Sequence, residues 1–341
     1  MTLDIRRPGT RRPTAPLSSR RSSWLVVALV AMVVAAWLAS SLPQPPPIGI
    51  PDPGVVTRWG LPVATVVRDL GASFAIGLLV IGLLMRSELS PATRLAMSRA
   101  IRGGALSTVV AVAALYLLTA SDVYSVPLGS VIGPDRLGAL YRETDIGRRL
   151  AQQIALWMLV TGAVLVPRPA GRAAALALAV GAMVPWAFGG HAAGSGDHRL
   201  AVYSVLLHLI GVTVWCGGVA ALVWVSRLEP ARTVAVMSRF SPVALVAFGV
   251  VGASGLLASW IRLPEVSALW GSGYGRLILV KAALLVVLGG FGAWHRRTAL
   301  RRMAGPRGAT TAAVVRAVAA EGLVMAAAMG VAVALSRTPL S

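Results

Sequence analysis

The sequence predicts an all-α, polytopic transmembrane helical bundle of about nine spans, with its N-terminus in the cytoplasm and its C-terminus outside. Hydrophobic residues make up 56% of the 341 residues and charged residues only 13%, whereas soluble globular proteins carry about 25% charged residues. The apolar residues gather in blocks long enough to cross a hydrocarbon core of about 30 Å. Most basic residues lie between these blocks. A soluble globular protein is therefore excluded, and the lipid bilayer is the expected solvent.

Nine apolar blocks account for most of the chain, and Pro and Gly residues mark many of their ends. In chain order, the predicted spans are 24–42, 62–85, 100–120, 150–166, 173–190, 200–226, 240–261, 275–294 and 312–335. We expect the first to remain as an uncleaved anchor, because its apolar stretch is long for a signal peptide. The fourth is the shortest. We divide the chain into a basic cytoplasmic tail (1–23), a three-span N-terminal region with an outer loop (24–149) and a six-span domain (150–336).

The distribution of basic residues predicts the orientation. With the N-terminus inside, the inner segments hold 21 of the 32 Lys and Arg residues and three acids, whereas the outer segments hold ten basic residues and eight acids. Loops on the cytoplasmic side of membrane proteins carry this excess of Lys and Arg. The net charge of +20 therefore reflects membrane topology, and we expect no nucleic-acid partner.

Several chemistries lack the residues they need. The single cysteine, Cys216, cannot form an intramolecular disulfide or a Cys-based cluster. No Walker A sequence is present, nor the Asp-Lys-Thr-Gly motif of P-type ATPases. Paired axial histidines for haem on facing spans are not evident, because besides His208 in the sixth span and the two histidines of the turn before it only His295 remains. We therefore expect a protein that is not an enzyme.

Ionisable residues inside the predicted spans are the functional candidates, because each is costly in lipid. Lys281 lies in the eighth span and Glu321 in the ninth. Antiparallel neighbouring spans could bring them together as an intramembrane charge pair. This pair has two interpretations: a structural contact that fixes helix packing, or a proton or cation relay through Glu321.

Three of the four histidines lie close together in the sequence. His191 and His198 lie in the Gly-rich outer turn between the fifth and sixth spans, and His208 lies eight residues into the sixth span, about 12 Å deep. Met158 and Met183 fall at a similar depth, and Cys216 lies deeper on the same helix. Imidazole and soft sulfur ligands suit copper, above all Cu(I). Methionine also fills packing gaps, so the pattern alone does not decide between metal binding and packing.

The residues around His208 resemble the CopD/PcoD copper-resistance and copper-transport family of bacterial inner-membrane proteins. Trp215-Cys216-Gly217-Gly218 follows His208, and its two glycines also permit close helix packing. The similarity covers about residues 150–336, and its other motifs are Arg239-Phe240-Ser241, Tyr274-Gly275-Arg276-Leu277 with Lys281, and Arg316 with Glu321.

The resemblance implies a multi-pass protein of the bacterial cytoplasmic membrane that transports or delivers copper. His191 and His198 would capture copper outside, His208 would bind it within the membrane, and Cys216 would lie on its way inward. An outer-compartment copper chaperone or a CtaG-like oxidase assembly factor would be a partner. The alternative is a membrane-integral assembly or scaffold protein that supports copper insertion into a respiratory oxidase. Some relatives carry a fused CtaG-like region, so a continuation beyond Ser341 would favour copper supply to an oxidase.

Overall fold

A computed structural model describes residues 49, 51–86, 88–166, 168–188, 198–262 and 267–302. This part of the chain is helical and contains no strand, which confirms the all-α class. Its α-helices are α2 (Val55–Leu84), α3 (Pro91–Val123), α4 (Pro134–Glu143), α5 (Asp145–Ala163), α6 (Pro169–Gly181), α7 (Met183–Ala187), α8 (His198–Leu228), α9 (Thr233–Arg262), α10 (Ala268–Gly271) and α11 (Gly273–Arg302); the short 3-10 helices are η1 (Leu128–Ser130) and η3 (Pro230–Arg232).

Among the described residues, five segments are long and apolar enough to cross a membrane: Val55–Leu84, Pro91–Val123, Pro169–Ala187, Leu200–Leu228 and Pro230–Ile261. They coincide with the second, third, fifth, sixth and seventh predicted spans. The fourth and eighth predicted spans lie in α5 and α11. The first and ninth predicted spans lie outside the described residues. The protein is therefore a helical membrane protein, and the count of nine spans stays a prediction.

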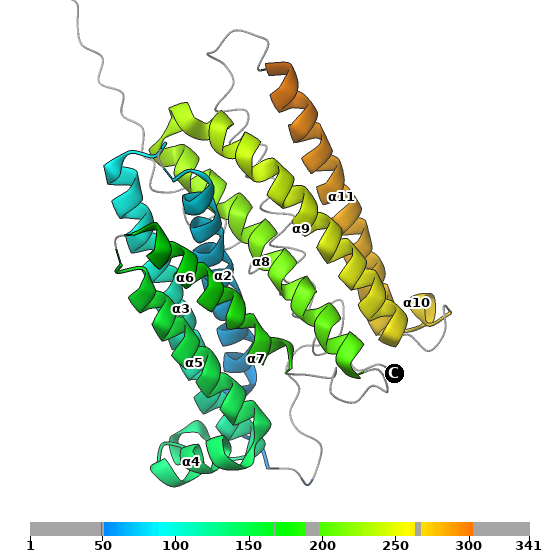
Figure 1. The fold of residues 1–341 in the computed structure, drawn as a ribbon. Coiled ribbons are helices and arrows are strands. Elements are labelled where there is room, and N and C mark those ends of the chain that lie inside the picture. Colours follow the sequence, from blue (N-terminus) through cyan, green and yellow to red (C-terminus); the bar gives the residue numbers. More distant parts are fainter. Residues whose placement is uncertain are drawn as a thin grey trace, which may run out of the picture.

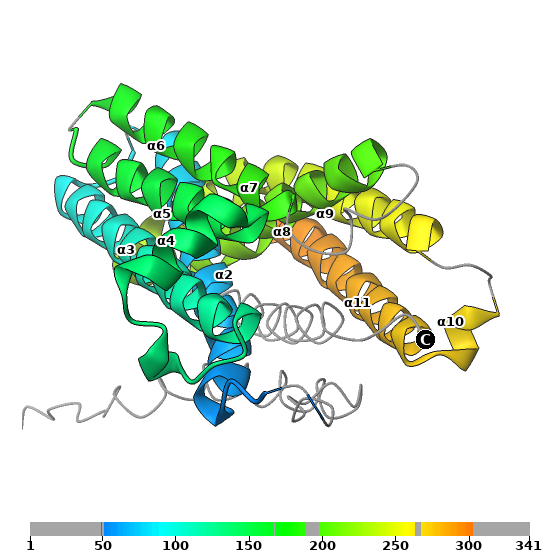
Figure 2. The same ribbon diagram turned by 90° about the horizontal axis from the view of Figure 1, so that it is seen from below.

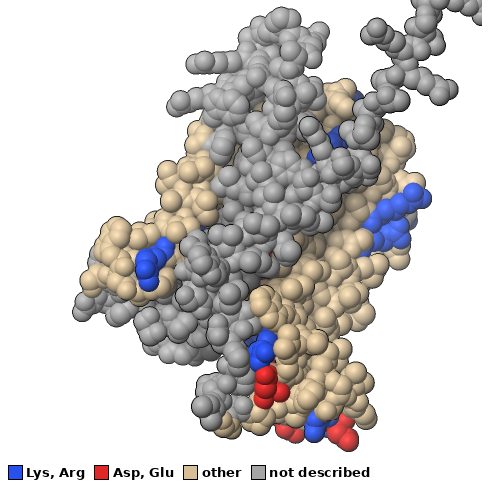
Figure 3. Space-filling view, turned by 180° about the vertical axis from the view of Figure 1, so that it is seen from behind, with Lys and Arg blue, Asp and Glu red and all other residues tan. Residues whose placement is uncertain are grey.

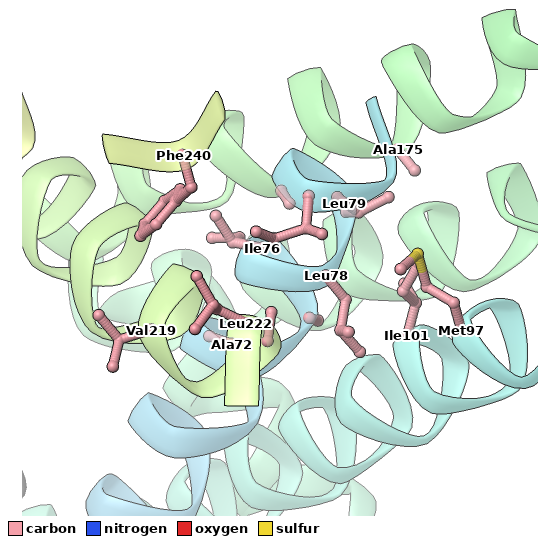
Figure 4. Close-up of a cluster of buried hydrophobic side chains, with 14 of the residues drawn as sticks. Ala72, Ile76, Leu78, Leu79, Met97, Ile101, Ala175, Val219, Leu222 and Phe240 are labelled. Carbon is pink, nitrogen blue, oxygen red and sulfur yellow. The ribbon is translucent and has the colours of Figure 1, made fainter. Parts of the chain in front are cut away.

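Helix α2 lies at the centre of the described bundle (Figures 1 and 2). Helices α3, α5 and α6 lie on one side of it, and α8, α9 and α11 on the other. Its largest contacts are with α3 and α8. Apolar side chains of α2 such as Ile76, Leu78 and Leu79 are fully buried, and Figure 4 shows them between Met97 and Ile101 of α3 and Leu222 of α8. This core joins the two sides of the bundle.

The two glycines after Cys216 lie at a close helix crossing. A Cβ atom added at Gly217 would lie 1.8 Å from the Ser73 carbonyl oxygen of α2, and one at Gly77 would lie 1.9 Å from the Gly217 carbonyl oxygen. A Cβ at Gly218 would meet the Phe240 ring of α9 at 2.0 Å. Only glycine fits where two helix backbones approach this closely. The predicted packing role of this Gly pair is confirmed.

One end of the bundle is tied together by polar contacts between distant segments. Glu229 accepts a hydrogen bond from the Ser90 backbone N–H at 2.7 Å, and the Ser90 hydroxyl caps α3 by accepting the Thr93 N–H. Arg239 of α9 donates to the Leu84 carbonyl oxygen at 2.8 Å and pairs with Glu88. The α2–α3 connection is thereby held against the α8–α9 connection.

Charged side chains are unevenly distributed along the bundle. On the face drawn in Figure 3, acidic side chains lie at the α4 end, whereas basic side chains also lie toward the opposite end. The α2–α3 connection lies at that opposite end (Figure 1). The orientation predicted from the loops, in which the α2–α3 connection is cytoplasmic, stays a prediction.

Candidate metal centre

His208 of α8 is half-buried between α9 and α11. Its Nδ1 atom lies 3.0 Å from the Ser254 hydroxyl of α9, and its Nε2 atom lies 3.3 Å from the Lys281 ammonium of α11. The Cε1 atom of the ring passes 3.8 Å from the Cβ position of Gly255. One imidazole thus contacts two neighbouring helices, and α9 presents a glycine where the ring passes.

The hydrogen bonds around His208 select one tautomer of its ring. The Ser254 hydroxyl donates to the Val250 carbonyl oxygen at 2.6 Å, so its oxygen is free to accept the Nδ1–H of His208. An ammonium group can only donate, so the Nε2 atom must accept from Lys281. Both contacts therefore require a proton on Nδ1 and leave the lone pair on Nε2. A hydrogen bond at one ring nitrogen commonly orients a metal-binding histidine for coordination through the other.

Ser254 is itself held in place. The Ser204 hydroxyl of α8 donates to the Ser254 carbonyl oxygen at 2.9 Å, and both side chains are buried. Ser204 lies one helical turn before His208 on the same face of α8. These two serines were not singled out from the sequence, although a hydroxyl in an otherwise apolar span is a detectable signal.

The predicted methionine ligands are not beside His208 on the α9 face of α8. Met183 of α7 is fully buried in the central core, and α7 packs on α8 through Ala187 near Ala201 and Val202. Met158 lies on α5 with 54% of its surface exposed, and α5 packs on α3, α4, α6 and α7. These methionines thus come from α5 and α7, whereas the side chains in contact with the His208 ring come from α9 and α11, and their role as ligands stays a prediction.

The remaining predicted ligands lie further along the chain or outside the described residues. Cys216 is half-buried against the central core, eight residues and about 12 Å along α8 from His208. His198 begins α8, whereas His191 and Glu321 lie outside the described residues. Within the described ranges, no three His, Cys, Asp or Glu side chains gather closely enough to hold a metal ion.

A second polar cluster lies on α2. Arg68 is buried, its Nε atom donates to Asp69 at 2.9 Å, and its guanidinium lies 3.8 Å above the Trp186 ring of α7. Adjacent opposite charges inside a predicted span were the available signal in the sequence. The cation–π contact links α2 to α7 and satisfies a charge that would be costly alone in this setting.

Comparison with known proteins gives two matching family models. The N-terminal domain of copper resistance protein D-like proteins matches residues 56–199, and copper resistance protein D matches residues 234–335. Copper transport protein CutJ of Bacillus subtilis (strain 168) is 33% identical over 193 residues, which cover 51% of this chain and 36% of CutJ. The chain thus matches about a third of the length of this curated relative. No solved structure matches the chain.

Proposed function

Since the chain belongs to the copper resistance protein D family, we propose that it transports copper across the bacterial cytoplasmic membrane, with His208 as the intramembrane ligand. One observation carries this proposal. The Nε2 lone pair of His208 points toward α11 while Ser254 holds the opposite side of the ring. Such an oriented imidazole suits copper.

The remainder of the proposed path follows the predicted topology of nine spans, with the N-terminus inside and the C-terminus outside. His191 and His198 capture copper at the outer surface and pass it to His208, and Cys216 lies deeper toward the cytoplasm. The thiol of Cys216 and the imidazole of His208 favour Cu(I). An outer-compartment copper chaperone is the proposed donor.

The ammonium group of Lys281 competes with copper for His208 in the proposed site. Its ammonium lies 3.3 Å from the same Nε2 lone pair that copper would need. Two cations cannot share one lone pair, so copper loading must displace the ammonium. The lysine stem is flexible, and Glu321 is the predicted acceptor for the displaced charge. In this proposal Lys281 keeps the histidine oriented before copper arrives and leaves when copper binds.

The test compares three forms of the full-length protein in detergent and in cells. Wild type should bind Cu(I) in competition with a chelator, and His208→Ala should lose the intramembrane site and copper accumulation. His295→Ala is the control, because His295 lies near the Arg-rich end of α11. Lys281→Met should raise the Cu(I) affinity by removing the competing cation. If His208→Ala binds and transports copper as wild type does, the proposal is wrong. Absence of stoichiometric copper together with co-purification of oxidase subunits would support an assembly role instead.

A further inference from the structure

Four arginines line one cavity at the end of the bundle that holds the α2–α3 connection. The cavity has a volume of about 310 Å³. Arg86 follows the end of α2, Arg94 lies in the second turn of α3, and Arg168 and Arg172 lie at the beginning of α6; Ser98 adds a hydroxyl. None of the cavity-lining residues is acidic. Residues distant in sequence thus form one strongly basic site.

The positive charge of this cavity is not neutralised within the described part of the chain. The ion pairs there involve none of these four arginines. The acids Glu88 and Glu229 of the α2–α3 and α8–α9 connections have other partners, because Glu88 pairs with Arg239 and Glu229 accepts the Ser90 N–H. Four guanidinium groups around one cavity repel each other. An anionic ligand would remove this repulsion.

Helix α6 adds a second attraction for an anion. Arg168 is its N-cap residue and no side chain caps the helix, which begins with Pro169. Both Arg168 and Pro169 line the cavity. Pro169 has no N–H and the Gly171 N–H bonds to the Arg168 carbonyl oxygen, so the attraction of this helix end comes mainly from the positive end of the helix dipole, which favours phosphate groups. Guanidinium groups also bind phosphate oxygens in a bidentate manner.

The remaining walls of the cavity are apolar. Leu83, Leu95, Val164 and Val166 line it, and Leu95 and Val166 are 53% and 45% exposed. Apolar side chains beside a basic cavity suit a molecule that carries both a phosphate and hydrocarbon. By the predicted topology this end faces the cytoplasm, where anionic lipids give the leaflet its negative charge.

We propose that this cavity binds the phosphate group of an anionic phospholipid from the cytoplasmic leaflet. The headgroup lies among Arg86, Arg94, Arg168 and Arg172, and the acyl chains extend along the exposed apolar side chains. Because the four arginines come from three segments, the bound phosphate joins the end of α2 to the beginnings of α3 and α6. This proposal is independent of the copper site.

The test uses purified full-length protein in a neutral detergent, with phosphatidylglycerol, phosphatidylcholine or inorganic phosphate added. Phosphatidylglycerol should raise the melting temperature and remain bound in native mass spectrometry, whereas phosphatidylcholine should do neither. The double variant Arg94→Gln/Arg172→Gln should weaken phosphatidylglycerol binding about tenfold or more, because it removes two of the four guanidinium groups that bind the phosphate oxygens. Arg99→Gln/Arg102→Gln is the matched control, since both residues lie on α3 outside the cavity lining.

The outcomes separate the sources of phosphate. Equal retention of phosphatidylglycerol by both double variants would overturn the proposal, because binding would then be unspecific. Protection by inorganic phosphate as strong as that by phosphatidylglycerol would show that the site takes free phosphate, and the lipid would be wrong. If Arg94→Gln/Arg172→Gln does not fold, the single variant Arg168→Gln should still weaken phosphatidylglycerol binding, and unchanged binding would overturn the proposal.

Discussion

Replacement of Gly217 by Ala tests the helix crossing that holds the two sides of the bundle together. Gly217 of α8 lies against the Ser73 carbonyl oxygen of α2, and the new methyl group would lie 1.8 Å from it. Contacts of a Cβ below 3.0 Å essentially do not occur in proteins. The obstacle is backbone, which cannot rotate away as a side chain could. The helices must therefore separate by at least about 1.2 Å at this point.

The energetic cost follows from this separation. Overpacking in a well-packed core costs about 1–3 kcal/mol and occasionally more, and alanine returns up to about 1 kcal/mol of helix propensity relative to glycine. Separation also loosens the packing of buried Leu222 and Ile76 near the crossing. We expect Gly217→Ala to lower the free energy of unfolding by about 1–3 kcal/mol in net terms.

Gly249→Ala is the matched control. Gly249 lies inside α9, and no atom of the described residues lies within 4 Å of its Cβ position. We expect this variant to be neutral or stabilised by up to about 1 kcal/mol. Unfolding of the purified full-length variants in mixed micelles with increasing sodium dodecyl sulfate measures the difference. If Gly217→Ala and Gly249→Ala unfold at the same detergent fraction, the close crossing of α2 and α8 is refuted.

Three further substitutions test single contacts. Hydrogen bonding to the Ser90 side chain, and also to its backbone, lowers the pKa of Glu229, so Glu229→Gln should lower the melting temperature at neutral pH. This difference should vanish as the pH falls through the lowered pKa, because the stabilising form is the carboxylate; a constant difference from pH 7 to pH 3 would contradict it. Ser254→Ala should weaken copper binding about tenfold to hundredfold without changing the melting temperature much. Ser259→Ala, whose hydroxyl donates to the Gly255 carbonyl oxygen of its own helix, should bind copper as wild type does. Trp186→Leu should cost about 2 kcal/mol by removing the contact with Arg68, measured against Trp260→Leu at an exposed position; equal unfolding free energies would exclude the cation–π contact.

Hydropathy predicted where helices lie better than where they end. Helix α3 begins at Pro91, not near residue 100, because the Ser90 cap and Pro91 at the first position start a helix in polar sequence. The predicted span 173–190 is two helices, α6 and α7. Pro185 cannot bond to the Gly181 carbonyl oxygen, and its ring crowds that carbonyl, so the break falls after Gly181. By contrast, α2 and α9 continue through Pro62 and Pro242.

The sequence predicted which residues belong to the site better than it predicted which of them contact each other. The cost of burial singled out His208 and Lys281 separately, but the sequence assigned Lys281 to Glu321 and not to His208. The spacing of residues in the sequence predicts how deep each one lies along its helix. Which sides of two helices face each other depends on tertiary packing, which the spacing does not predict. The pairing of Lys281 with Glu321 stays a prediction, since Glu321 lies outside the described residues.

The contacts of α8 differ in tightness around the helix, and this difference bears on how copper could reach His208. On the α2 side, backbone meets backbone at Gly77 and Gly217, so sliding or separation there would disrupt the central core. Toward α9, Gly218 packs equally closely against the Phe240 ring, and the Cβ position of Gly211 lies 2.9 Å from Val251. The contact of His208 itself is looser, because its ring lies 3.8 Å from the Cβ position of Gly255. Displacement of Lys281 from His208 therefore requires rearrangement around this ring and not at the α2–α8 crossing.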